Sequence, residues 1–187
     1  HCAPGTPLIA ETGGLNAMIV DSTALPEHAV RDIINGAFRS AGQRCSALRC
    51  LYVQEDIADN LLKMLKGAMN ELSVGDPWHL STDVGPVIDA AAHKGIADHI
   101  AQATAEGRII HQIKAPQNGH FIAPTAIRVS GIAEMTKEIF GPVLHVATFK
   151  SNELDKVVAA INATGYGLTF GLHTRIDDRV QTIVEKV

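Results

Sequence analysis

The stretch "AMIVDSTALPEHAVRDIINGAF" (residues 17–38), together with "RCLYVQ" (residues 49–54), decides the fold class. "AMIV" is short and apolar, as a buried strand is, and "RCLYVQ" has the same character. Between them, apolar residues recur at helical spacing from Glu27 to Ser40, and Pro26 stands where a helix start tolerates proline. A strand, a helix and a second strand in this order predict parallel strands joined by a helix that packs on their sheet.

The rest of the chain continues the alternation of strands and helices. Further strands are expected in "RIIHQI", "FIAPTAIRV", "PVLHVATF" and "LTFGLHT", and further helices near residues 56–69, 89–106, 153–162 and from 177 onward. We therefore expect an α/β fold, a layered α/β/α domain with a largely parallel sheet, over residues 1–187.

Length and composition fit one ordinary globular domain. The chain has 187 residues, of which 46% are hydrophobic and 19% charged, and its formal net charge is −4. Lys and Arg are scattered, so we expect no binding of nucleic acid by this segment. No apolar run approaches the roughly 20 residues needed to cross a bilayer, so we expect no membrane span.

The cysteine and histidine patterns argue against disulfides and metals. There are three cysteines without a CxxC motif, which favours a reducing, cytoplasmic setting. The nine histidines form no HxxxH or Cys/His cluster, so no metal site is expected. The chain begins at His1 rather than Met and stops in "VEKV" inside an apparent helix, so we expect it to be a piece of a longer protein.

Two cysteines stand five residues apart in "AGQRCSALRC" (residues 41–50). Cys45 follows the helical periodicity in a polar, glycine-bearing loop, and the adjacent Arg44 would favour its thiolate. By itself this pattern leaves open whether Cys45 is a nucleophile or an inert thiol. Cys50 lies in the apolar strand and is expected to be a small core residue.

Two carboxylates also stand in suggestive places. Glu11, in "ETGG", follows an apolar run and precedes a glycine turn, where parallel-sheet enzymes place their sites. A base there would serve the hydrolytic half of cysteine chemistry, although Glu11 would equally serve to cap the turn. Glu138 opens "EIFGPV", which is typical either of an ordered functional loop or of an ordinary turn between strands.

"ETGG", then "GQRC" 34 residues later, then "EIFGPV", resembles in this order the catalytic domain of the NAD(P)-dependent aldehyde dehydrogenases. "NATGYGLTFGLHTR" resembles a later region of that family, so the likeness covers essentially the whole chain. Within the family, "PLIAETGGLNAMIVDSTALPE", "AGQRCSALR" and "TDVGPVID" are most similar to the glutamate-semialdehyde (1-pyrroline-5-carboxylate) dehydrogenase branch. This branch includes the bacterial bifunctional flavoenzymes of proline catabolism.

The resemblance implies a role for each candidate side chain. Cys45 would attack the aldehyde carbon, its backbone N–H would stabilise the resulting oxyanion, and Glu11 would activate the water that hydrolyses the thioester. Ser46 would help to hold the α-carboxylate of the substrate, L-glutamate γ-semialdehyde.

The resemblance also implies NAD as the cofactor. Glu138 would bind the nicotinamide ribose, Phe140 would flank the nicotinamide, and Gly13 would belong to the same cofactor site. FAD would belong only to a separate proline dehydrogenase domain of the parent protein. We expect the parent protein to be a homo-oligomer.

Two departures from the family qualify these implications. The first is Leu15, which stands where the family usually has Lys. The second is the set of family parts that this sequence does not contain; no GxGxxG motif is present, and none is expected in this half. The domain that holds the adenosine half of NAD, the asparagine that completes the oxyanion hole and the C-terminal segment would all lie outside this sequence. Two other readings remain open: an aldehyde dehydrogenase of another substrate class, and a folded but catalytically inert fragment.

Overall fold

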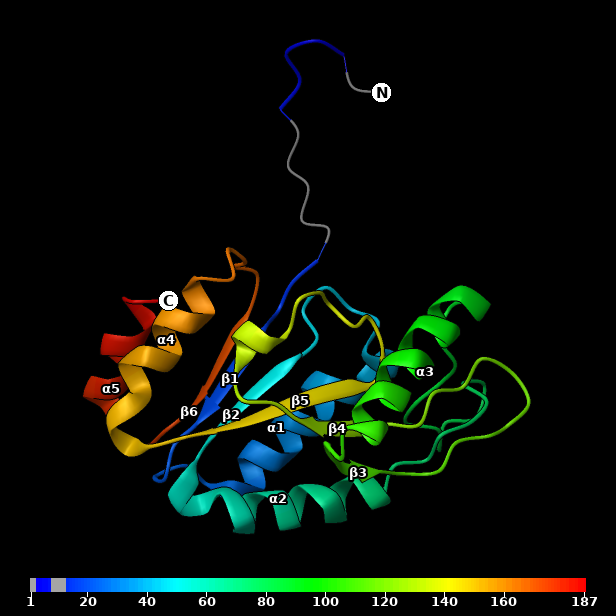
Figure 1. Cartoon of the computed structure of the whole chain (residues 1–187), viewed down its shortest axis with the longest axis horizontal. Helices are drawn as coiled ribbons and strands as arrows, with labels where there is room; N and C mark the ends of the chain where they lie inside the picture. The colour runs from blue at the N-terminus through cyan, green and yellow to red at the C-terminus, as the bar shows by residue number, and fades with distance from the viewer. Residues whose placement is uncertain (1–2, 8–12) are drawn as a thin grey trace.

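A computed structural model describes residues 3–7 and 13–187 of the chain. These residues form a six-stranded sheet in the order β3-β4-β5-β2-β1-β6 (Figure 1). The strands are β1 (Ala17–Val20), β2 (Cys50–Gln54), β3 (Ile109–Gln112), β4 (Thr125–Arg128), β5 (Val143–Phe149) and β6 (Phe170–His173).

Five helices connect or flank the strands. They are α1 (Pro26–Phe38), α2 (Glu55–Asn70), α3 (Ala90–Ala105), α4 (Leu154–Asn162) and α5 (Asp177–Val184), with 3₁₀ turns η1 (Arg39–Gly42), η2 (Ile132–Glu134) and η3 (Ser151–Glu153). Of the helices described, none has both the length and the apolarity that crossing a membrane requires.

The sheet is parallel except at one edge. β1 pairs in parallel with β2 and β6, β2 with β5, and β4 with β5, whereas β3 pairs antiparallel with β4. In the pairing of β1 with β2, Ala17 lies opposite Cys50 and Val20 opposite Val53, so α1 is the crossover between parallel neighbours. The expected α/β class with a largely parallel sheet is confirmed.

Helices cover both faces of the sheet, and each face has its own apolar core (Figure 1). Leu51 and Val53 of β2 pack with α1, α2 and α3, whereas Cys50 and Tyr52 pack with α4 and α5. Successive side chains of a strand point to opposite faces, so a strand buried on both faces reads as a continuous apolar run. Because helices cover both faces, every residue of "CLYVQ" is buried.

One strand is shorter than the sequence predicts. "FIAPTAIRV" forms a strand only over β4, which begins at Thr125 directly after Pro124. Proline has no N–H to donate to the sheet, so pairing starts at the next residue, whose N–H bonds the carbonyl of Pro142 at 3.0 Å.

Candidate active site

The candidate residues that the structure describes gather at the amino ends of the strands. Cys45 and Ser46 precede β2, Gly13 precedes β1, and Glu138 and Phe140 precede β5. The general rule, used above for Glu11, would place a site at the opposite, carboxyl edge. The described candidates depart from it because Cys45 lies in the loop that returns from a helix to its strand, and that loop lies at the amino edge.

The loop that carries Cys45 starts with an unusual backbone turn. Ser40, Ala41 and Gly42 have φ values of 57°, 52° and 65°, so three consecutive residues are left-handed. This conformation costs a non-glycine residue roughly 1–2 kcal/mol, and such residues cluster at functional sites. At Gly42 it is accompanied by close packing, because a Cβ there would lie 2.1 Å from the carbonyl oxygen of Gly141.

Cys45 and Ser46 are exposed at the end of this loop. Arg44, which we expected to act on the thiol, binds the end of the preceding helix. Its Nη2 donates to the carbonyl oxygens of Asn35 at 2.8 Å and Gly36 at 3.2 Å, near the end of α1. The side chain thus satisfies carbonyl groups that a helix terminus leaves without partners.

Among the described residues, Arg49 is the largest fully buried side chain, and it links the cysteine loop to the "EIFG" segment. Its Nε and Nη2 lie 2.9 and 2.8 Å from Glu138 Oε1. Its Nη1 donates to the carbonyl of Gly141 at 3.2 Å, and its Nη2 donates to the carbonyl of Arg44 at 3.1 Å. One guanidinium therefore contacts two of the three segments that the resemblance assigns to the site.

Glu138 is fixed from a third direction by the glycine turn before β1. The backbone N–H of Gly14 donates to Glu138 Oε2 at 3.0 Å. A Cβ at Gly13 would lie 2.9 Å from that same oxygen, so a side chain at this position would require the carboxylate to shift. Phe140, 45% exposed, presents its ring beside this cluster, with the Arg49 guanidinium carbon 5.1 Å from the ring centroid.

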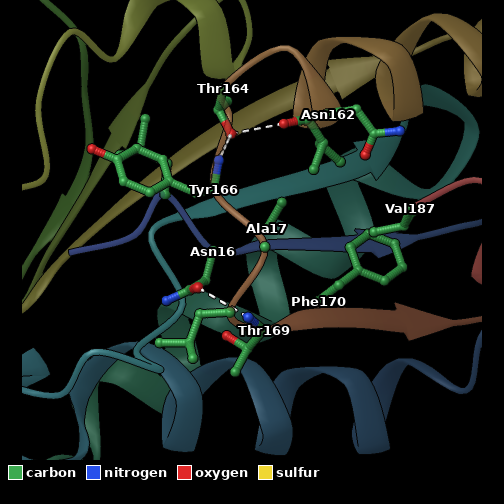
Figure 2. A pocket seen from close by; sticks show the side chains of 12 residues that line it. Asn16, Ala17, Asn162, Thr164, Tyr166, Thr169, Phe170 and Val187 are labelled. Carbon is green, nitrogen blue, oxygen red and sulfur yellow. Dashed lines mark hydrogen bonds between the residues drawn. The ribbon is translucent and has the colours of Figure 1, made fainter. Parts of the chain in front are cut away.

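Asn16 ties the cysteine loop to β1 and β6. Its Nδ2 donates to the carbonyl oxygens of Cys45 at 2.7 Å and Ala47 at 2.8 Å, and its Oδ1 accepts from the N–H of Thr169 at 3.3 Å. Figure 2 shows Asn16 and Thr169 at the edge of a cavity of about 130 Å³ between β1 and the end of α4. Cys45 does not line this cavity.

The second cysteine of "AGQRCSALRC" is a core residue, as expected. Cys50 is fully buried at the start of β2, and both Cys45 and Cys50 are free thiols. Burial raises the pKa of the Cys50 thiol to about 12, because the thiolate would lose its hydration.

One predicted site residue lies outside the described residues, and two residues of the site were not predicted. Glu11 falls among residues 8–12, outside the described residues, so its role stays a prediction. Arg49 and Asn16 were not singled out from the sequence. A charged residue directly before the apolar run "CLYV", and an amide directly before "AMIV", were the signals available. Across residues 3–7 and 13–187, no three His, Cys, Asp or Glu side chains gather as metal ligands.

Comparison with known proteins confirms the resemblance. The sequence profile of the aldehyde dehydrogenase family matches residues 2–187. The bifunctional protein PutA of Klebsiella aerogenes is 53% identical over 186 residues, which cover 95% of this chain and 14% of that protein. The 1-pyrroline-5-carboxylate dehydrogenase of Bacillus cereus (strain B4264) is 37% identical over 179 residues, which cover 93% of this chain and 34% of that protein.

A solved structure gives the same result. A crystal structure of bifunctional proline utilization A (PutA) superposes with a TM-score of 0.95 at 50% identity, covering 99% of this chain and 19% of that one. The chain thus spans about a seventh of the PutA relative and a third of the 1-pyrroline-5-carboxylate dehydrogenase. The family profile covers nearly all of the sequence, and the chain belongs to the aldehyde dehydrogenase family.

Proposed function

We propose that this chain is the cysteine-bearing part of an NAD-dependent enzyme that oxidises L-glutamate γ-semialdehyde to L-glutamate. The observation that carries the proposal is the exposed Cys45 in a loop whose backbone is tied through the buried Arg49 to Glu138. The substrate follows from relatives named PutA and 1-pyrroline-5-carboxylate dehydrogenase. Because those relatives are much longer, other parts of the enzyme would hold the adenosine half of the cofactor.

The chemistry runs through Cys45 and Glu11. The Cys45 thiolate attacks the aldehyde carbon, a C–S bond forms, and the Cys45 N–H donates to the oxygen that becomes negatively charged. When bound, NAD⁺ would supply the hydride acceptor that oxidation of this carbon to the Cys45 thioester requires. Glu11 takes a proton from the water that attacks the thioester carbon, and the C–S bond breaks to release the acid and the thiolate.

The described residues fit the nicotinamide end of the cofactor. A carboxylate has about four acceptor positions, and the contacts to Gly14 and Arg49 leave room at Glu138 for a ribose hydroxyl. The exposed ring of Phe140 offers an apolar aromatic face to a flat heterocycle. At Gly13 the absence of a Cβ leaves backbone accessible beside the carboxylate.

The experiment uses the full-length enzyme that contains this chain. Cys45→Ala should abolish NADH formation from glutamate semialdehyde, whereas Cys50→Ala should retain most of it. Glu11→Gln should give a burst of NADH followed by turnover about 10²–10⁴-fold slower than wild type, because loss of a positioned base slows deacylation. Comparable losses in Cys45→Ala and Cys50→Ala would refute the assignment of the nucleophile.

A further inference from the structure

We propose that Arg49 and Asn16 are positioning residues that fix the peptide groups on the two sides of Cys45. They hold its backbone N–H ready for the oxygen of a tetrahedral intermediate. The inference rests on the proposed function, because it assumes that Cys45 attacks a carbonyl carbon.

Arg49 fixes the peptide group that precedes Cys45. Its Nη2 donates to the carbonyl oxygen of Arg44 at 3.1 Å. That oxygen and the Cys45 N–H belong to one planar peptide group, so holding the oxygen restricts the direction of the N–H. A hydrogen bond to the oxygen also polarises the group and makes its N–H a stronger donor.

Asn16 fixes the peptide group that follows Cys45. Its Nδ2 donates to the carbonyl oxygen of Cys45 at 2.7 Å, and the same nitrogen donates to Ala47 at 2.8 Å. Its Oδ1 accepts from the Thr169 N–H at 3.3 Å (Figure 2). Turning the amide over would therefore lose all three hydrogen bonds. With both flanking peptide planes held, the φ and ψ of Cys45 are set, and so is the direction of its Cα–Cβ bond relative to its N–H.

Both positioning residues are themselves rigidly placed. Arg49 is fully buried and Asn16 is 5% exposed, although Cys45 is exposed. Arg49 also binds Glu138 and Gly141, so the segment proposed to face the cofactor is fixed to the same guanidinium. A preorganised N–H donor at an oxyanion typically contributes 10²–10³-fold in rate, and it does so only when its direction is fixed beforehand.

Two reagents separate this role from general support of the loop, and neither needs a cofactor. With p-nitrophenyl acetate, the thiolate attacks the carbonyl carbon, a C–S bond forms through a tetrahedral oxyanion, and the C–O bond breaks to release p-nitrophenolate. With iodoacetamide, the thiolate displaces iodide from a CH₂ group, and no oxyanion forms. The ratio of acylation rate to alkylation rate at Cys45 therefore reports on the oxyanion donor.

The test measures this ratio in the full-length enzyme for Arg49→Lys and Asn16→Asp. Lysine keeps the positive charge near Glu138 but lacks the planar guanidinium, whose separate N–H groups bind Glu138, Gly141 and Arg44 together. Aspartate keeps an acceptor for the Thr169 N–H but cannot donate to the carbonyl of Cys45. Acylation should fall at least roughly tenfold in each variant, while alkylation changes by less than about threefold. Where Asn16→Asp does not fold, Asn16→Ser, which keeps a donor of shorter reach, takes its place with the same expectation.

Gln43→Ala is the matched control. Gln43 lies in the same loop, and its side chain bonds the carbonyls of Ser40 and Pro86 and the N–H of Ile88 but makes no hydrogen bond to the peptide groups of Cys45. Its loss should leave the ratio unchanged. The inference is overturned if the ratio stays at the wild-type value in the Arg49 and Asn16 variants, or if Gln43→Ala lowers it equally.

Cys45→Ala distinguishes failure of this inference from failure of the proposed function. If Cys45→Ala retains the acylation activity, Cys45 is not the nucleophile and the proposed function fails with the inference. If Cys45→Ala abolishes acylation while the ratio is unaffected in the Arg49 and Asn16 variants, only the positioning role is refuted.

Discussion

The buried guanidinium of Arg49 lies 2.9 Å through Nε and 2.8 Å through Nη2 from Glu138 Oε1. The pair joins residues 89 positions apart, and the Glu138 side chain is only 12% exposed. Burial lowers the pKa of Arg49 from its usual value, and the charge of Glu138 opposes that shift. Since the interior solvates neither charge well, each partner depends on the other.

We therefore expect Glu138→Gln to destabilise the chain by about 3 kcal/mol, because removing one partner leaves a buried charge uncompensated. Urea unfolding of the wild-type and variant chains measures the difference. The control is Asp98→Asn, which breaks the exposed pair between Lys94 and Asp98 and should change the free energy of unfolding little. Equal effects from the two substitutions would contradict the importance of the buried pair.

Two of the glycines with positive φ, Gly42 and Gly107, should respond differently to alanine. Both have positive φ, at 65° and 68°, but a Cβ at Gly42 would lie 2.1 Å from the carbonyl oxygen of Gly141, whereas nothing lies within 4 Å at Gly107. Gly107→Ala should cost only the conformational term of roughly 1–2 kcal/mol. Gly42→Ala must also displace backbone next to Arg49, so its loss of stability should be clearly larger.

Thermal unfolding of both variants checks this comparison. Because Gly42 packs against the segment that holds Glu138 and Phe140, Gly42→Ala should also slow aldehyde oxidation in the full-length enzyme, and Gly107→Ala should not. Equal melting temperatures would mean that the close approach of the two loops is readily relieved.

The fold could be predicted from the sequence because its signals are local. "AMIV" and "CLYVQ" are apolar on both faces, and α1 has its apolar residues at helical spacing, so strand, helix and parallel class follow from short windows. Asp89 and Gly107 similarly mark the two ends of α3, through a side-chain bond to the N–H of Ala92 and a left-handed turn.

The interior of the candidate site could not be predicted in the same way. Cys45, Glu138 and Phe140 were found through motifs, but the residues that join them act over long distances in sequence. Arg49 reaches Glu138 over 89 residues, and Asn16 binds the N–H of Thr169 over 153. A buried charge and a buried amide look like surface residues in a single sequence until their partners are known.

The two described cysteines should differ in accessibility to alkylation. Cys45 is exposed, whereas Cys50 is fully buried and its pKa is raised to about 12. Iodoacetamide should therefore label Cys45 in the folded chain and leave Cys50 unmodified, while in denaturant both should react. Arg49 stands between them, so trypsin places them in different peptides for mass spectrometry. Labelling of Cys50 in the folded chain would show that the sheet opens there.

A pair of histidines should make stability depend on pH. His145 is buried, its Nδ1 lies 3.2 Å from the carbonyl oxygen of Arg49, and its Nε2 lies 2.9 Å from Nε2 of His99. A carbonyl only accepts, so His145 must donate through Nδ1, and its Nε2 must accept from His99. Protonation of His145 would place two N–H groups against each other. Burial first, and then the charge of His99, lower its pKa to about 4.

In the unfolded chain this histidine has a pKa of about 6.5, so between that value and about 4 the unfolded state binds more protons. The free energy of unfolding should therefore fall as the pH is lowered through this range, by up to about 1.4 kcal/mol per pH unit for His145 alone. The pKa of His99 is lowered as well, chiefly by burial, so its contribution has the same sign. Urea unfolding at a series of pH values from neutrality down to about 5 measures the slope.

His145→Gln is the variant that isolates this effect, because glutamine retains hydrogen-bonding groups and does not titrate. It will lower stability at every pH by disturbing a buried contact, so the decisive quantity is the slope rather than the absolute value. The slope should flatten by roughly 1 kcal/mol per pH unit relative to wild type. His111→Gln is the control, since His111 bonds Asn70 at the exposed end of α2, and it should leave the slope unchanged. An unaltered slope in His145→Gln would mean that other groups carry the acid sensitivity.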